Sequence, residues 1–153
     1  MISMQMVNEN TWIIYQGDRI NDSVAARVMQ LTGRIQAELG PCLTDIIPSY
    51  TSVLVSVDLR QIDRLVTEAR LRAAMAQVQN EGPSATEAKE ILLPVYYGTE
   101  VALDMEHIAR QCELAPEEVI RLHSEQAYRV YAIGFSPGFA YLGNTPTQLR
   151  VAR

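Results

Sequence analysis

The chain has 153 residues, 48% of them hydrophobic and 20% charged, a composition typical of one ordinary folded domain or two small ones. Its net charge of −5 and the lack of a Lys/Arg cluster argue against nucleic-acid or anionic-membrane surfaces, which bind basic patches. No apolar run approaches the roughly 18 residues that span a bilayer, and the first residues lack the basic region of a secretory signal, so we expect a cytoplasmic protein. Cys42 and Cys112 form no Cys-x-x-Cys pair and the two histidines have no metal-ligand spacing, which predicts neither a redox motif nor a metal site.

The N-terminal part of the chain predicts a hairpin followed by a helix. Residues 4–16 place strong strand formers on both sides of a short polar turn, as in a β-hairpin. Asn21 and Asp22 are good N-cap residues for an amphipathic helix, and Gly40-Pro41 ends its pattern. The apolar positions of this helix recur at helical spacing, at Val24, Val28, Leu31, Ile35 and Leu39.

A second extended region and a second helix follow. Residues 44–57 are predicted to be extended, with Pro48 at a bend or sheet edge and alternate valines on one face. Asp58 is placed to cap the next helix. We expect its apolar stripe to be formed by Ile62, Leu65, Val66, Ala69, Ala73 and Ala76. Two helices over one small sheet predict an α+β domain at residues 1–80, in the manner of a ferredoxin-like fold.

A second domain is expected over residues 90–153. Residues 81–89 are small and polar without apolar periodicity, which is typical of a linker. Residues 91–97 then predict a short buried strand. Asp104 is placed as a helix cap, a role that explains it better than general-base chemistry, and Pro116 opens a further helix at its first position. The face of the first of these helices is expected to contain Met105, Ile108, Ala109 and Cys112.

The most informative stretch is residues 133–143, which contain three glycines, one proline and three aromatic residues after a strand predicted over residues 128–135. Pro137 and Gly138 suit positions i+1 and i+2 of a type II turn, because proline presets a negative φ and glycine accepts a positive one. Two interpretations stay open: a loop whose backbone N–H groups approach a ligand or partner, or a turn whose aromatic rings fill a core. Ser136 formally fits the Gly-x-Ser-x-Gly pattern of hydrolases, but the next residue is proline and has no N–H for an oxyanion hole, so we do not expect a nucleophile.

The pattern Gly-Phe-x-Pro-Gly-Phe-x-Tyr-Leu-Gly at residues 134–143 resembles the signature of the family that contains the 5-oxoprolinase B subunit, allophanate hydrolase subunit 1 and the kinase inhibitor KipI. Residues 93–98 and 119–130 resemble the same family in order and spacing, as do residues 45–55, so the likeness covers nearly all of the chain. It implies a cyclophilin-like β-barrel for the second domain. Relatives continue past the signature, so we expect an incomplete barrel that pairs with another copy or is partly mobile around residues 136–153.

The resemblance implies a subunit of an ATP-dependent 5-oxoprolinase, which converts 5-oxoproline to glutamate with companion subunits, above all a carboxyltransferase-like C subunit. Two alternatives stay open: a KipI-like inhibitor of a sporulation histidine kinase, and a subunit of an allophanate hydrolase or urea carboxylase. No Gly-x-x-x-x-Gly-Lys phosphate loop occurs, so ATP is expected to need the assembled complex. Catalytic residues stay unassigned, and the expected ligand- or partner-binding residues are Tyr97, His123, Gly134, Phe135, Pro137, Gly138, Phe139, Tyr141 and Gly143.

Two of these residues keep a structural alternative. His123 lies at a predicted helix end, where it would satisfy free carbonyl groups, or else lines the ligand pocket that the resemblance implies. Tyr97 would present its hydroxyl or ring face to a planar amide, or belong to the core. Residues 98–103 depart from the family, whose members commonly carry a further glycine and a proline before the aspartate, so a pocket wall built there is expected to be altered.

Overall fold

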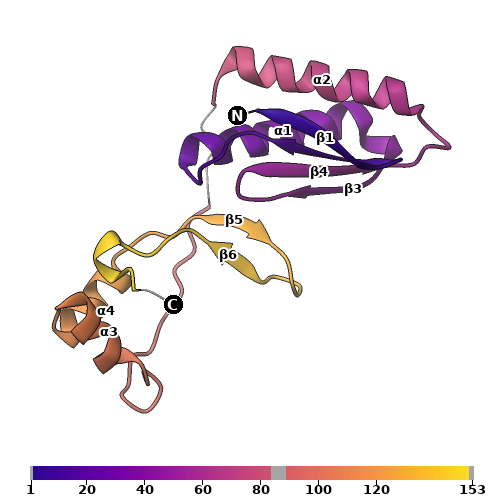
Figure 1. Ribbon diagram of the computed structural model, residues 1–153. Coiled ribbons are helices and arrows are strands. Elements are labelled where there is room, and N and C mark those ends of the chain that lie inside the picture. Colours follow the sequence, from indigo (N-terminus) through magenta and orange to yellow (C-terminus); the bar gives the residue numbers. More distant parts are fainter. Residues whose placement is uncertain (1, 84–88, 152–153) are drawn as a thin grey trace. The chain divides into compact units, whose positions relative to one another are not determined.

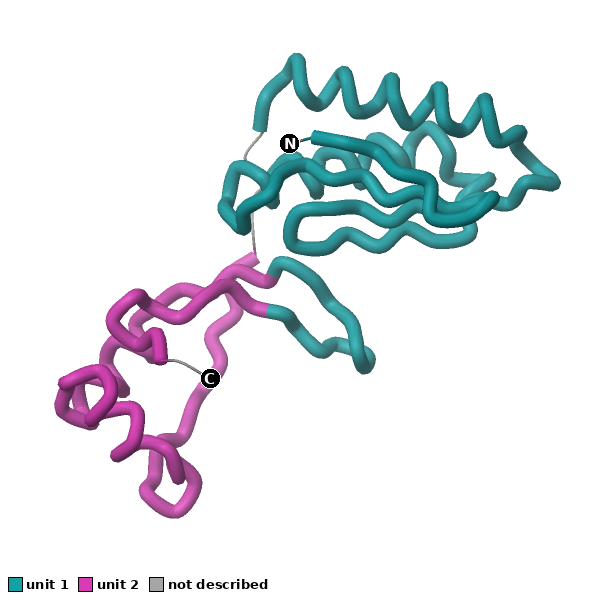
Figure 2. The backbone as a smooth tube through the Cα atoms, in the orientation of Figure 1, with its two compact units in different colours: residues 1–87, 131–141 teal, residues 88–130, 142–153 magenta. Residues whose placement is uncertain are grey.

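The computed structural model describes residues 2–83 and 89–151 and divides the chain into two compact units (Figures 1 and 2). The first unit contains residues 1–87 and 131–141, and the second contains residues 88–130 and 142–153. Most of the predicted linker, at residues 84–88, lies outside the described residues.

The first unit is built on one antiparallel sheet of four strands in the order β1-β2-β4-β3 (Figure 1). Strands β2 and β3 both pair with β4, so they run parallel to each other on its two sides and are joined through helix α1. This is the split βαβ arrangement of a ferredoxin-like layer, with β1 adding the fourth strand from the N-terminal side. The bounds are β1 Ser3–Asn8, β2 Thr11–Tyr15, α1 Asp22–Leu39, β3 Leu43–Pro48, β4 Ser52–Val57 and α2 Arg64–Glu81.

One face of this sheet is buried beneath the two helices. Trp12 lies opposite Val55 and Ile14 opposite Val53, so all four side chains point to the same face, and all are buried. The pairing confirms the predicted alternation of valines in β4. The described core joins these strands to both helices through Trp12, Ile14, Val24, Val28, Leu31, Ile35, Leu39, Val53, Val55, Val57, Ile62, Leu71, Ala74, Met75 and Val78.

Helix α1 begins as predicted. Asn21 is its N-cap residue, and the side-chain oxygen of Asn21 accepts a 2.9 Å hydrogen bond from the backbone N–H of Val24. The predicted apolar stripe is buried over its whole length. After Leu39 a short 3-10 turn at Gly40–Cys42 ends the helix, because Pro41 cannot supply the N–H that would continue it.

We expect Asn21→Ala to lower the free energy of unfolding of the first unit by about 1 kcal/mol, because it removes the acceptor for one free N–H of α1. Asn21→Asp keeps a side-chain oxygen at the cap and is the matched control. It is expected to stay within a few tenths of a kcal/mol of the natural chain. Urea unfolding followed by the fluorescence of Trp12, the sole tryptophan, measures both variants. Equal destabilisation by alanine and aspartate would contradict the capping role.

The prediction for α2 was wrong in its cap and in its face. Asp63, not Asp58, is the N-cap, since its carboxylate accepts from the backbone N–H groups of Leu65 and Val66. Ala69 and the other alanines of the predicted stripe are exposed, and of that stripe only Ile62, which precedes the helix, is buried. The buried side chains of α2 are Thr67, Leu71, Ala74, Met75 and Val78. Alanine and charged residues are spread around most of the circumference of α2. The spacing of its apolar residues therefore did not identify the face that packs on the sheet.

The second unit contains two short helices that pack on each other. Pro116 lies at the first position of α4, as predicted, and Asp104 is at the N-cap position of α3 without making a side-chain capping bond. Ala109, Val119 and Leu149 form the buried cluster of this unit, with the predicted face of α3 packed around it. The bounds are α3 Met105–Cys112, α4 Pro116–Ser124 and the 3-10 turn η2 Thr147–Leu149.

The prediction of a strand at residues 91–97 is wrong. This segment has no regular structure, and its side chains are largely exposed, Leu92 to 94%. A strand is stable only when a neighbour completes its hydrogen-bond ladder, and no described strand pairs with this segment. The second two-stranded sheet is formed by β5 Val130–Ile133 and β6 Ala140–Leu142, a shorter first strand than predicted, so the cyclophilin-like barrel stays a prediction.

No helix among the described residues is both long and apolar enough to cross a membrane.

Candidate functional site

The second unit brings Tyr97, His123 and Tyr128 together. The Tyr97 hydroxyl lies 2.5 Å from Nδ1 of His123, and the two rings meet edge to face with their centroids 5.9 Å apart. The centroid of the Tyr128 ring lies 5.5 Å from that of the His123 ring, at an interplanar angle of 44°. His123 is in the last turn of α4, and its hydrogen bond is with Tyr97 rather than with a helix carbonyl.

The hydroxyl of Tyr128 is the unusual group of this cluster. Its oxygen is buried and has no hydrogen-bond partner within the described part of the chain. Burial, and then the neighbouring Tyr97, raise the pKa of Tyr128 above the ordinary value for a phenol, which keeps the hydroxyl protonated and able to donate. Tyr128 was not among the predicted site residues, because residues 128–135 were predicted to form a strand, although Tyr128 lies within a segment that resembles the family.

The signature loop forms the tip of the β5–β6 hairpin. The backbone N–H of Phe139 donates a 3.0 Å hydrogen bond to the carbonyl of Ser136, and Gly138 has a φ of 79°. Proline at i+1 and a positive φ at i+2 define the predicted type II turn, which is therefore confirmed. The N–H of Gly134 bonds the carbonyl of Phe139 and closes the hairpin below the turn.

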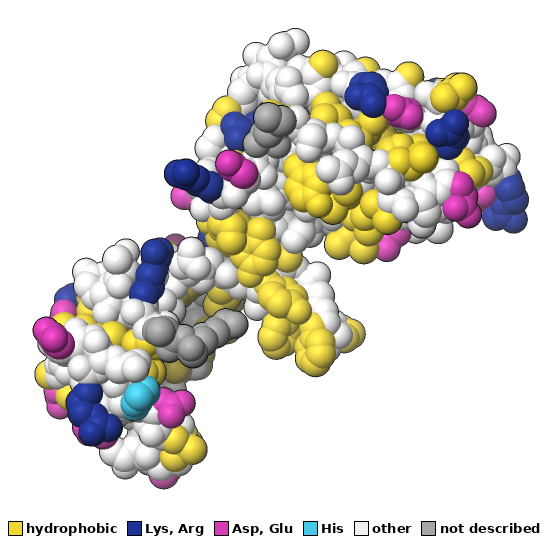
Figure 3. Space-filling model, viewed as in Figure 1, with side chains coloured by type: hydrophobic (Ala, Val, Ile, Leu, Met, Phe, Trp, Pro, Cys, Tyr) yellow, Lys and Arg dark blue, Asp and Glu magenta, His cyan; other side chains and the backbone are white. Residues whose placement is uncertain are grey.

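Phe135 has a backbone conformation that the sequence did not predict. Its φ is 67°, and the residues on its two sides are joined by a 2.8 Å bond from the N–H of Ser136 to the carbonyl of Gly134, which makes a γ-turn of the rare positive-φ kind. Its ring is 89% exposed and packs edge to face on Phe139, which packs in the same way on Tyr141. Figure 3 shows hydrophobic side chains over this hairpin, and no charged residue occurs between Val130 and Leu149.

The loop also holds two free backbone donors. The N–H groups of Phe135 and Gly138 donate to no described residue, so they are available to an acceptor oxygen from outside the hairpin. Ser136 is followed by Pro137 and then by a strand, not by a helix, which removes the context that a hydrolase nucleophile elbow needs.

The predicted site residues therefore fall into two groups, one in each compact unit. Tyr97 and His123 are in direct contact, and Phe135, Phe139 and Tyr141 form one aromatic row. Gly143 follows the hairpin, where its N–H bonds the carbonyl of Arg129. The remaining predicted residues shape the turn itself and are Gly134, Pro137 and Gly138.

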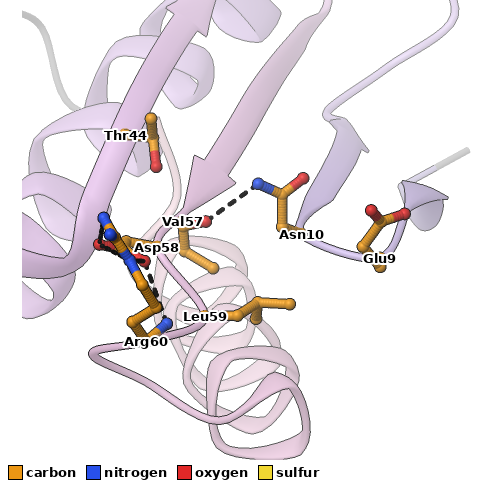
Figure 4. Close-up of a pocket in the computed structure, with 7 residues that line it drawn as sticks. All are labelled: Glu9, Asn10, Thr44, Val57, Asp58, Leu59 and Arg60. Atoms are coloured by element: carbon orange, nitrogen blue, oxygen red, sulfur yellow. Dashed lines mark hydrogen bonds and ion pairs between the residues drawn. The ribbon is translucent and has the colours of Figure 1, made fainter.

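The first unit has an open pocket of about 350 Å³ where the β1–β2 turn meets the end of β4 (Figure 4). Three of the polar residues that line it are engaged in structural hydrogen bonds. Asn10 donates a 3.1 Å bond to the carbonyl of Val57, and the Asp58 carboxylate is held by the guanidinium of Arg60. Bonds from the Arg60 side chain, and then from its backbone N–H, hold the pKa of Asp58 well below its usual range. These pairs shape the turn before α2. The described residues contain no group of three His, Cys, Asp or Glu that would hold a metal ion.

Comparison with known proteins identifies the family. The family described as "Carboxyltransferase domain, subdomain C and D" matches residues 2–153. The chain therefore belongs to this carboxyltransferase-domain family, as the signature loop indicated.

Three curated relatives share one name, each being the B subunit of a 5-oxoprolinase. The B subunit of Bacillus subtilis is 27% identical and matches 98% of this chain. That of Escherichia coli O157:H7 is 34% identical and matches 74% of this chain, and that of Haemophilus influenzae is 42% identical and matches 44%. This chain spans 66%, 50% and 32% of the lengths of these relatives, respectively.

The crystal structure of TTHA0988 has the same fold in the part that matches. The TM-score is 0.72 at 26% sequence identity, over 94% of this chain and 26% of that one. A second crystal form of TTHA0988 matches 99% of this chain with a TM-score of 0.69.

Proposed function

We propose that this chain belongs to the B subunit of a 5-oxoprolinase-type enzyme, which opens the ring of 5-oxoproline to give glutamate. The observation that carries the proposal is the family match over residues 2–153, together with three relatives that share one name. The name of those relatives also implies further subunits, and we propose a carboxyltransferase-like C subunit among them.

The proposed reaction needs ATP because an amide carbonyl is a poor electrophile. Transfer of the terminal phosphoryl group to the ring carbonyl oxygen would activate that carbon. One water molecule would add there and release the ring nitrogen, which leaves an acyl phosphate, and a second water molecule would release the phosphate. The products are glutamate, ADP and phosphate. Negative charge builds up on oxygen as water adds, and backbone donors already aimed at that oxygen stabilise it without reorganisation.

The signature loop supplies donors of this kind. The N–H groups of Phe135 and Gly138 donate to no described residue, and the hydrogen bonds of the γ-turn and the type II turn fix the backbone around them. We propose that the loop offers these groups to an oxygen of the substrate or of a partner protein. ATP binding is assigned to the assembled complex, and the proposed location is the cytoplasm.

The purified chain alone is expected to show no ATP-dependent hydrolysis of 5-oxoproline, and activity is expected when companion subunits are added. Glutamate and phosphate release measured together test this, with each subunit omitted in turn as the control. Turnover by the isolated chain would contradict the proposed dependence on partners. A complete set that assembles but stays inert would refute the enzymatic role and favour a KipI-like regulator.

A further inference from the structure

Two polar groups of this cluster have no hydrogen-bond partner among the described residues. The buried hydroxyl of Tyr128 is unpaired, and no described residue bonds Nε2 of His123, although the two rings are only 5.5 Å apart. Buried polar groups normally have partners, because an unpaired one has lost its hydration without a hydrogen bond to replace it. The unpaired Tyr128 hydroxyl, whose ring lies beside an imidazole with a nitrogen that no described residue bonds, therefore points to an acceptor that binds from outside the chain.

The bond between Tyr97 and His123 favours one tautomer of the imidazole. The only partner of the Tyr97 hydroxyl among the described residues is Nδ1 of His123. If Nδ1 carried the hydrogen, the hydroxyl would accept it and its own proton would have no acceptor. Donation from Tyr97 to Nδ1 satisfies both groups, and in the neutral ring it leaves the hydrogen on Nε2.

We propose that Tyr97 is a positioning residue that holds neutral His123 as the Nε2–H tautomer, and that His123 Nε2 and the Tyr128 hydroxyl together bind an oxygen of a small amide or carboxylate. Two aromatic rings lie close to the imidazole, a setting that suits a flat, compact ligand. The identity of the ligand rests on the proposed function, according to which the ligand is 5-oxoproline. The tautomer does not rest on it.

The tautomer is tested on the full chain by the ¹⁵N chemical shifts of the His123 ring at a pH where the ring is neutral. We expect the Nε2–H form to predominate, and Tyr97→Phe to give a mixture of both forms. Tyr96→Phe is the matched control, since it removes a hydroxyl from the next residue, where the bond goes to Glu100 at 2.7 Å. Predominance of the Nδ1–H form in the natural chain, or no change in Tyr97→Phe, would overturn the positioning role.

The binding site is tested by titrating 5-oxoproline into the same sample. A saturable shift of the Nε2 signal is expected, with an apparent Kd about tenfold weaker in Tyr128→Phe and unchanged in Tyr96→Phe, because one hydrogen bond is lost. Proline, which keeps only the carboxylate, and pyrrolidone, which keeps only the ring carbonyl, identify the bound oxygen. No shift with any of the three, or equal affinity in Tyr128→Phe, would overturn the site.

The assembled enzyme separates this inference from the proposed function. If the complete set turns over 5-oxoproline equally well with Tyr128→Phe, the site is refuted and the function stands. If the chain binds 5-oxoproline through Tyr128 but the complete set is inert, the hydrolytic function is refuted and the site stands.

Discussion

Leu71→Ala is expected to lower the free energy of unfolding of the first unit by about 2–5 kcal/mol. Leu71 is 0% exposed and lies in the cluster that joins α2 to the sheet, so the smaller side chain leaves a cavity as well as losing buried apolar area. Urea unfolding followed by Trp12 fluorescence measures the loss, because Trp12 is buried in the same cluster.

Leu65 provides the matched control, since it is the same residue type in the same helix but is 65% exposed. Leu65→Ala is expected to change the stability by no more than about 0.5 kcal/mol. Alanine has at least the helix propensity of leucine, so neither variant loses stability through the helix itself. A larger loss for Leu65→Ala than for Leu71→Ala would restore the face predicted from the sequence and contradict the observed packing.

Gly138→Val is expected to disrupt the signature loop, because a β-branched residue resists the positive φ at this position at a cost of about 1–3 kcal/mol. No atom lies within 4 Å of the position that a Cβ would occupy, so backbone strain is the cause and not a clash. The bond from Phe139 N–H to the Ser136 carbonyl reports on the turn, and its amide hydrogen exchange is expected to be faster in the variant. In an assembled complex, partner affinity is expected to fall by about 5- to 150-fold if the partner contacts this loop.

Two controls make the loop prediction specific. Gly138→Asn is expected to retain more of the turn than valine, since asparagine tolerates a positive φ better. Ser136→Ala keeps the backbone bonds of the loop and is expected to leave both amide exchange and partner affinity unchanged. Equal loss of activity from Ser136→Ala and Gly138→Val would refute the ranking and revive a nucleophilic serine.

Short-range chemistry determined much of this protein from sequence alone. Asn21 and Pro116 mark helix starts, and Pro137-Gly138 makes the type II turn, because each acts through the backbone within a few residues. The alternation of valines in β4 was readable for the same reason, since side chains of a strand point to opposite faces in turn. The signature of the loop was also sufficient to indicate the family.

Only the tertiary structure decided which surfaces meet. The buried face of α2 depends on packing of Leu71 in a core with strands that are distant in the sequence. Alanine is found both in cores and on exposed helix faces, so the alanines of α2 do not identify the buried face. Residues 91–97 have the composition of a strand but no described partner, and an extended segment without a hydrogen-bond ladder stays exposed. Both outcomes depend on long-range pairing, which local propensity does not encode.

The candidate site shows the same division. Tyr97, His123 and the glycines of the loop could be selected from the sequence because they fall within motifs of the family. The bond from Tyr97 to His123, the unpaired hydroxyl of Tyr128 and the positive φ of Phe135 could not, because each depends on how the folded chain satisfies its polar groups. Sequence by itself determined the start of α1, the type II turn and the family. The tertiary structure decided the packing faces and the donors left free, because burial and hydrogen bonding become defined only when distant segments come together.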